Sequence, residues 1–143
     1  MKIIIASSCI QAVGSHAQST FPQECCGFML GTKSNDGGRT VTELYKIDNI
    51  NATNPGRQYH MNPKQQLEAE RYTREEKLEI LGVYHSHPNH SSQASEFDRI
   101  HALPFWSYLI ISCINGKRGQ IQSWRLREDR SQFDEEVLIE KPF

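Results

Sequence analysis

Apolar and polar positions along the chain form short blocks that predict strands and helices. Most of the apolar blocks are four to eight residues long, which is typical of buried strands. They predict strands at residues 2–6, 25–32, 41–47, 80–84, 108–114 and 120–127, the fourth of which continues into residues 85–88 and ends at Pro88. The loop at residues 33–38, with Gly37 and Gly38, joins the second and third strands as a hairpin.

Three other segments have the capping residues and periodicity of helices. They are residues 7–18, 63–78 and 95–103. We expect Ser7 or Ser8 to cap the first helix, and Asn62 to cap the second, with Pro63 at its first position and Gln65 at its third. The apolar stripe of the second helix is thin, so one of its sides is expected to face water.

The order of these elements indicates the fold class. Strands alternate with helices only in part, and residues 133–139 fit either one more strand or a terminal helix. A length of 143 residues suits one domain, which we expect to span residues 1–143. The sequence therefore predicts a single α/β domain with a mixed sheet flanked by helices.

Charge and hydropathy exclude two classes of partner. Sixteen Lys and Arg residues against 17 Asp and Glu residues give a net charge of −1, which leaves no basic field for a nucleic acid or an anionic membrane. No run approaches the ~20 apolar residues of a membrane span. Four cysteines without a C-x-x-C spacing favour neither a disulfide framework nor a zinc ribbon, so we expect a cytoplasmic protein.

The most informative stretch is His85-Ser86-His87-Pro88, followed ten residues after Pro88 by Asp98. Residues two apart on a strand point to one face, so the imidazoles of His85 and His87 can reach one metal ion. Asp98, in the first turn of the next helix, can add an oxygen ligand. Two imidazoles and one carboxylate leave a fourth position open, as in catalytic zinc sites.

Each half of this pattern also has an ordinary structural interpretation. Two histidines at this spacing also occur on solvent-exposed strands without a metal, and Ser95-x-x-Asp98 at a helix start is a capping box. The metal hypothesis rests on both halves occurring together at fixed spacing.

The spacing H-x-H-P-x6-S-x2-D resembles that of the JAMM (MPN-plus) metalloprotease family. The family also carries a glutamate upstream, at the start of a glycine-containing strand, and PQECCGFMLG at residues 22–31 fits this with Glu24. The resemblance implies the JAMM/MPN architecture, which is similar to that of cytidine deaminases. A zinc deaminase itself is excluded, because its H-x-E and P-C-x-x-C motifs are absent.

The resemblance also implies the roles of five residues. His85, His87 and Asp98 would bind one Zn²⁺ per chain, Glu24 would be the general base and acid, and Ser95 would stabilise the oxyanion. Cys25 and Cys26 are interpreted as buried structural thiols. His90 is a candidate for substrate contact and His101 for support of the metal ligands, whereas His16 and His60 are interpreted as structural.

The implied substrate is a ubiquitin-like protein with a C-terminal Gly-Gly tail. The chain resembles bacterial stand-alone enzymes that trim sulfur-carrier proteins, since about 60 residues separate Glu24 from His85 and leave no room for a long insert. Two alternatives stay open: an isopeptidase that releases a modifier from lysine, and a non-catalytic MPN scaffold. The sequence leaves the oligomeric state, monomer or homodimer, undecided.

Overall fold

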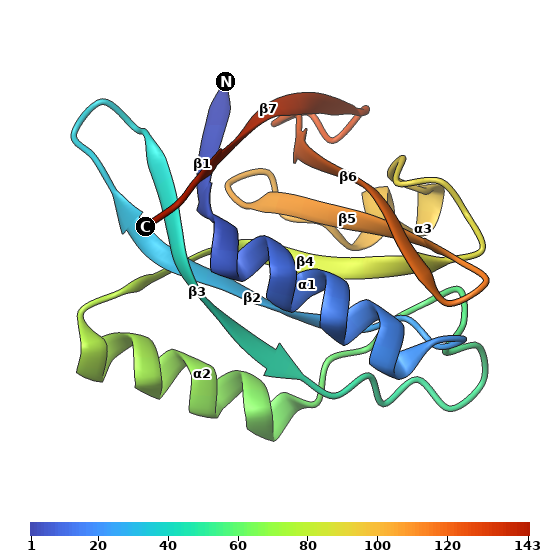
Figure 1. The fold of residues 1–143 in the computed structure, drawn as a ribbon. Coiled ribbons are helices and arrows are strands. Elements are labelled where there is room, and N and C mark those ends of the chain that lie inside the picture. Colours follow the sequence, from blue (N-terminus) through green and yellow to red (C-terminus); the bar gives the residue numbers. More distant parts are fainter.

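The computed structural model describes residues 1–143 and contains seven strands and three helices (Figure 1). The strands are β1 Lys2–Ala6, β2 Cys26–Lys33, β3 Arg39–Ile47, β4 Glu79–Pro88, β5 Ser107–Ile114, β6 Lys117–Leu126 and β7 Phe133–Lys141. The helices are α1 Ser7–Thr20, α2 Pro63–Glu76 and α3 Glu96–His101. Every expected element is present, and residues 133–139 belong to a strand rather than to a helix.

The sheet closes on itself, in the order β1-β3-β2-β4-β5-β6-β7. Closure depends on β1, which pairs in parallel with β3 on one side and with β7 on the other. β4 and β5 are also parallel, and the remaining neighbours are antiparallel. The expectation of a mixed sheet is confirmed, but the expected sheet flanked by helices did not include its closure. Closure requires pairing of the first strand with the last, and these two strands are far apart in sequence.

The helices divide between the two faces of the sheet (Figure 1). α1 lies on the face where Ile3, Ile5, Met29 and Tyr84 form one apolar cluster together with helix residues such as Val13. α2 and the end of α3 cover the other face, and its cluster has these buried members: Cys26, Phe28, Leu30, Ile47, Met61, Ala69, Val83, Ala102, Tyr108 and Leu126. Because side chains alternate along β4, this strand contributes to both clusters.

The helix starts test the expected caps. In α2, the side chain of Asn62 accepts a hydrogen bond from the backbone N–H of Gln65 at 3.2 Å, so this cap is confirmed. In α1, the cap position is Ala6 and no side chain caps the helix. The prediction of a Ser7 or Ser8 cap was wrong because β1 runs into α1 without a loop, and the Ser7 hydroxyl instead donates to the carbonyl of Lys141.

Two further features concern the cysteines and the helices. All four cysteines are buried free thiols. No helix has both the length and the apolar character that a membrane crossing requires.

The strand that carries the two histidines runs very close to its neighbour. At Gly82 an added Cβ atom would lie 1.9 Å from the carbonyl oxygen of Ser107 on β5, which is backbone and cannot swing away. At Gly119 on β6 the nearest atom would be 3.4 Å away, an ordinary contact distance. Glycine at position 82 therefore permits the close parallel pairing of β4 and β5.

We predict that Gly82→Ala lowers the free energy of unfolding by about 2 to 3 kcal/mol, because the strands must separate to admit the methyl group. Gly119→Ala, on β6 at the other side of β5, is the matched control and should cost less than about 1 kcal/mol. Urea unfolding followed by circular dichroism measures both values. Equal stability of the two variants would contradict the close approach at Gly82.

Candidate metal centre

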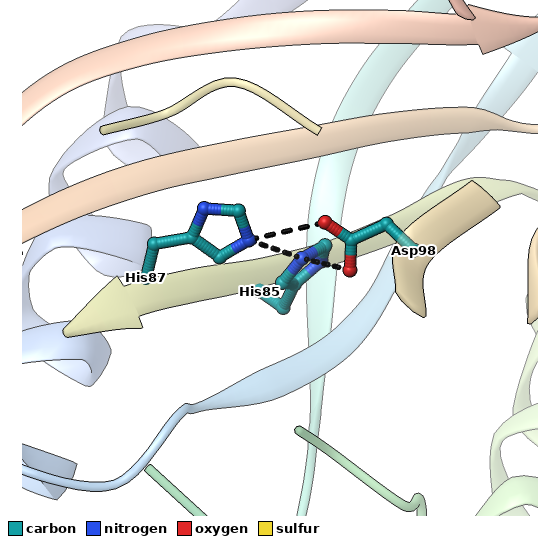
Figure 2. A group of neighbouring side chains, drawn as sticks. All are labelled: His85, His87 and Asp98. Atoms are coloured by element: carbon teal, nitrogen blue, oxygen red, sulfur yellow. Dashed lines mark hydrogen bonds and ion pairs between the residues drawn. The ribbon is translucent and has the colours of Figure 1, made fainter. Parts of the chain in front are cut away.

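Three side chains converge at one point beside the carboxyl end of β4. His85 and His87 come from β4, and Asp98 comes from the first turn of α3 (Figure 2). All three are buried, with at most 6 % of each residue exposed to solvent. The structure thus brings together the three residues that the sequence selected as metal ligands.

The donor atoms of these side chains lie close to one another. The Nε2 atom of His85 is 3.2 Å from that of His87, and the two nitrogens are 3.0 and 3.1 Å from the two oxygens of Asp98. Donors bound about 2.0 to 2.1 Å from a tetrahedral Zn²⁺ are separated by about 3.3 Å from one another. The spacing of the donor atoms therefore fits a tetrahedral metal ion.

A backbone contact sets the proton position of His87. Its Nδ1 atom lies 2.7 Å from the carbonyl oxygen of Ser91, which can only accept a hydrogen bond, so Nδ1 carries the proton. In the neutral ring, Nε2 then has a lone pair directed at the Asp98 carboxylate and at the Nε2 atom of His85. Three electron-rich atoms in this arrangement favour a bound cation, and a histidine held through its other nitrogen is a common ligand arrangement.

His85 is held by packing rather than by a hydrogen bond. Its ring lies against that of Tyr59, with centroids 4.7 Å apart and planes inclined by 32°. Its Nδ1 atom is buried and has no hydrogen-bond partner. The orientation that directs Nε2 toward the Asp98 carboxylate thus depends on the aromatic ring of Tyr59.

Asp98 combines two roles that had seemed to be alternatives. Its Oδ2 atom accepts from the backbone N–H of Ser95 at 2.8 Å, and the Ser95 hydroxyl accepts from the backbone N–H of Asp98 at 3.1 Å. This is the capping box of α3. The same carboxylate faces both histidines, so the helix cap also orients the ligand.

The buried charges of the cluster depend on one another. Burial alone would favour the neutral acid, but the neighbouring His85 and His87 hold the pKa of Asp98 far below its usual range. Burial likewise disfavours a charged imidazole, yet attraction to Asp98 raises the pKa of His85. A positive charge at this point is therefore strongly favoured, whether a proton or a metal ion provides it.

Glu24 reaches the centre through strand pairing. Cys26 on β2 is paired with His85 on β4, and Ser86 donates its N–H to the Cys25 carbonyl at 3.3 Å, while its hydroxyl accepts from the Cys25 N–H at 2.8 Å. Extending this antiparallel register by one more residue places Glu24 opposite His87. Opposite residues share a face of the sheet, so Glu24 lies on the same side as the ligands.

The environment of Glu24 suits a residue that exchanges protons. The residue is 3 % exposed, and its Oε1 atom is buried without a hydrogen-bond partner. Burial raises the pKa of the Glu24 carboxyl to about 7, although His85 and His87 act in the opposite direction. A carboxyl with a pKa near neutrality can both accept and return a proton under physiological conditions.

A polar cleft of about 300 Å³ opens over this arrangement. None of the side chains that line it is hydrophobic: they belong to Glu24, Arg57, His87, His90, Ser91, Gln93 and Ser95. The hydroxyl of Ser95 accepts from the α3 backbone but donates to no protein group, so its proton is free to bind a ligand. Glu24, Ser95 and His87 therefore face one shared space.

Several residues of the site were not identified from the sequence. Arg57 and Tyr59 lie between β3 and α2, in a segment where the sequence indicated no functional residue. Asn49 anchors this loop, because its amide donates to the carbonyls of Glu24 and Gln58 at 3.1 Å each. No local pattern indicates these contacts, and only the Asn-rich composition of the loop suggests a structured turn.

Of the other histidines and thiols near the site, one lines the cleft and the others have structural surroundings. His90 lines the cleft, as expected of a candidate for substrate contact. His101 does not support the metal ligands: it is exposed, lies against the Phe97 ring and has its Nδ1 atom 2.9 Å from the Phe97 carbonyl. Cys25 and Cys26 are buried, and burial raises the pKa of the Cys25 thiol to about 12, so neither favours a thiolate.

Comparison with known proteins gives a family match over most of the chain. The family model described as prokaryotic homologs of the JAB domain matches residues 6–127. The desampylase of Haloferax volcanii is 28% identical over 116 residues, or 78% of this chain and 81% of that protein. The desampylase of Pyrococcus furiosus is 25% identical over 118 residues, or 82% and 76%.

One relative is much longer than this chain. The tail tip assembly protein K of Escherichia phage N15 is 30% identical over 90 residues, which cover 63% of this chain but only 32% of the phage protein. The matched part of this chain thus corresponds to about a third of that relative.

Solved structures include similar folds. A solution structure of a Desulfitobacterium hafniense protein superposes with a TM-score of 0.85 and 30% identity, over 99% of this chain and 94% of that one. The crystal structure of a JAB1/MPN domain protein from Archaeoglobus fulgidus has a TM-score of 0.59 at 17% identity, over 97% and 99%. The second likeness concerns the fold alone.

We predict that the purified chain binds about one transition-metal ion and that His87→Ala abolishes this binding, because the variant loses one of three convergent donors. Elemental mass spectrometry of both proteins, purified without a metal-binding tag, measures the content. His101→Ala is the matched control and should keep the metal. Retention of a full metal equivalent by His87→Ala would place the ion elsewhere.

We further predict that the Glu24 carboxyl of the metal-free protein titrates with a pKa of about 7, compared with 4.5 for an ordinary glutamate. The neutral carboxyl is favoured in the fold, so its contribution to stability is lost as the pH rises from about 4.5 through 7. A bound divalent cation should lower the pKa by attraction.

Carboxyl ¹³C chemical shifts followed over a pH series, with Glu24→Gln to assign the signal, measure this titration. A midpoint near 4.5 in the metal-free protein would show that Glu24 is more hydrated than the structure indicates.

Proposed function

The chain belongs to the family of prokaryotic homologues of the JAB domain, and from this membership we propose that it is a zinc-dependent peptidase. It hydrolyses an amide bond at or near the C-terminus of a ubiquitin-like protein of the sulfur-carrier type. The observation that carries the proposal is the convergence of His85, His87 and Asp98 beside the buried carboxyl of Glu24. Family membership supports the hydrolase class, and the donor set supports zinc.

The proposed roles of the metal ion and of Glu24 follow from the chemistry of these side chains. Zn²⁺ held by His85, His87 and Asp98 would act as a Lewis acid that polarises the scissile carbonyl and lowers the pKa of water. Glu24 accepts the proton of the attacking water and returns it to the departing amine. Burial raises the pKa of the Glu24 carboxyl to about 7 before any metal binds, and a bound cation lowers it, so the ionised form that accepts the proton is populated at neutral pH.

Ser95 stabilises the oxyanion in this proposal. Its hydroxyl oxygen accepts from the backbone of α3, and this contact holds the group in place while its proton stays available. A preorganised donor of this kind can contribute about 3 kcal/mol to transition-state stabilisation. Helix capping and catalysis are compatible because they use different parts of the hydroxyl.

The compact architecture supports a sulfur-carrier substrate with a C-terminal Gly-Gly tail. Between Glu24 and His85 the chain forms only β2, β3, α2 and the first part of β4, apart from the loops that join them. The cleft is open and polar, as a flexible chain end requires. We place this activity in the cytoplasm, where the four free thiols stay reduced.

A second candidate is the removal of a ubiquitin-like modifier from a lysine side chain. It is favoured by the relatives named desampylases, which are similar to most of this chain. The two candidates share the metal chemistry and differ in the leaving group: an amino acid or short peptide in one case, and a lysine side chain in the other.

The test uses a ubiquitin-fold protein whose Gly-Gly tail is extended by one residue, and the same protein joined to the lysine side chain of a peptide. We predict that the zinc-loaded enzyme shortens the extended tail, as measured by intact mass, and that Glu24→Gln keeps the metal but loses at least about 10²-fold in kcat. Glu79→Gln, an exposed change on the same strand as the histidines, is the control and should leave turnover unchanged.

The outcomes separate the possibilities. Cleavage of the lysine linkage alone would replace trimming by deconjugation. Failure of the metal-loaded protein to cleave either substrate would leave a binding module, and near-normal turnover by Glu24→Gln would remove Glu24 from the mechanism.

A further inference from the structure

A cationic side chain stands in the catalytic cleft without an anionic partner. Arg57 lines the cleft together with Glu24, His87 and Ser95. The ion pairs of the protein involve Arg99, Arg125, Arg127 and the two metal-ligand histidines, and none includes Arg57. The guanidinium is thus an uncompensated positive charge beside the reacting groups.

His90 fixes the position of this charge. The Nη2 atom of Arg57 lies 2.8 Å from the Nε2 atom of His90, and since a guanidinium can only donate, the imidazole accepts. His90 is itself anchored, because its carbonyl accepts from the Ser112 hydroxyl at 2.6 Å. A neutral acceptor orients the guanidinium without cancelling its charge and leaves its other donors free.

The loop that carries Arg57 is also held in place. Asn49 donates to the carbonyls of Pro55 and Gln58, and the backbone N–H of Glu24 donates to the Pro55 carbonyl at 2.8 Å. The segment before and after Arg57 is therefore tied to the backbone of Glu24. This tie fixes the backbone from which the Arg57 side chain extends relative to the backbone of Glu24.

We propose that Arg57 binds the carboxylate of the residue that leaves, and so selects substrates in which the scissile bond is followed by a free chain end. This inference rests on the proposed peptidase function. Hydrolysis breaks the C–N bond, with the hydroxyl of water going to the acyl carbon and a proton to the leaving nitrogen. In a terminal residue the α-carboxyl carbon is two bonds from that nitrogen, within the same small cleft.

The chemistry of the two proposed leaving groups differs at this point. A lysine side chain places four methylene groups next to the scissile nitrogen and brings no carboxylate near it. It would leave the guanidinium unpaired and put apolar groups in a cleft whose lining has no hydrophobic side chain. A terminal amino acid pairs its charge with Arg57, since guanidinium and carboxylate match in shape and in hydrogen-bond geometry.

The test measures binding, so that turnover is not required. The metal-loaded Glu24→Gln protein is titrated with a synthetic peptide ending in Gly-Gly-Ala, as the free acid and as the C-terminal amide. The free acid should bind about ten- to a hundredfold more tightly than the amide. Arg57→Gln, added to the same protein, should reduce the affinity for the acid to that for the amide, whereas Arg74→Gln, an exposed change on α2, should keep the preference.

Two further measurements distinguish a C-terminal carboxylate from a side-chain carboxylate and test the role of His90. A Gly-Gly-Asp peptide amide carries its only acid in a side chain, and it should bind like the neutral amide. Binding as tight as that of the free acid would overturn selection of a chain end. His90→Ala should lower the ratio of acid to amide affinity, and His90→Gln, which keeps an acceptor, should restore part of it.

The failure of this inference is distinguishable from the failure of the proposed function. Equal or undetectable binding of acid and amide, or a preference that survives Arg57→Gln, overturns the role of Arg57 even if the wild-type enzyme cleaves the extended carrier. Acid-selective binding that depends on Arg57, in a protein that cleaves neither substrate, upholds the carboxylate site and overturns the peptidase.

Discussion

The candidate site depends on the antiparallel pairing of β2 with β4. This pairing joins segments about 60 residues apart in sequence and sets the register in which Cys26 faces His85. The exchange of hydrogen bonds between Cys25 and Ser86 continues the ladder by one residue before the start of β2. A shift by one residue would turn Glu24 to the opposite face of the sheet, away from the histidines. This register therefore places Glu24 beside His85 and His87, whereas Asp98 reaches them from α3.

A second constraint is electrostatic and acts at Asp98. Its carboxylate is buried, caps α3 and faces two imidazole nitrogens at the same time. Removing it would break one of the two hydrogen bonds of the α3 capping box and would take the carboxylate away from both imidazoles. A positive charge at this point, from a proton or from a metal ion, helps to offset the cost of burying the carboxylate, so the geometry favours a bound cation. Packing of Tyr59 against His85 adds orientation where no hydrogen bond is available.

The polar loop between β3 and α2 contributes side chains both to the His85–His87–Asp98 cluster and to the cleft beside it. Asn49 ties the loop to Glu24, and the same loop contributes Tyr59 to the metal centre and Arg57 to the cleft. The hydrogen bonds of Asn49 thus hold together the backbone of Glu24 and the loop that carries Arg57 and Tyr59. Loops held by a rigid scaffold commonly carry function, because their backbone can present polar side chains that a strand would bury.

The sequence by itself determined the local features of this protein. Alternation along β4 was enough to put His85 and His87 on one face, and the Ser95-x-x-Asp98 spacing was enough to predict a capped helix, because both patterns extend over a few residues. The tertiary structure decided the rest. Contacts of β1 with the chain end close the sheet and hold residues 133–141 as a strand. The direct passage of β1 into α1 leaves the start of that helix without a side-chain cap. Asn49 and Arg57 are positioned by hydrogen bonds to residues 25 and 33 positions away in sequence. A local pattern of apolar and polar residues does not indicate contacts over such separations.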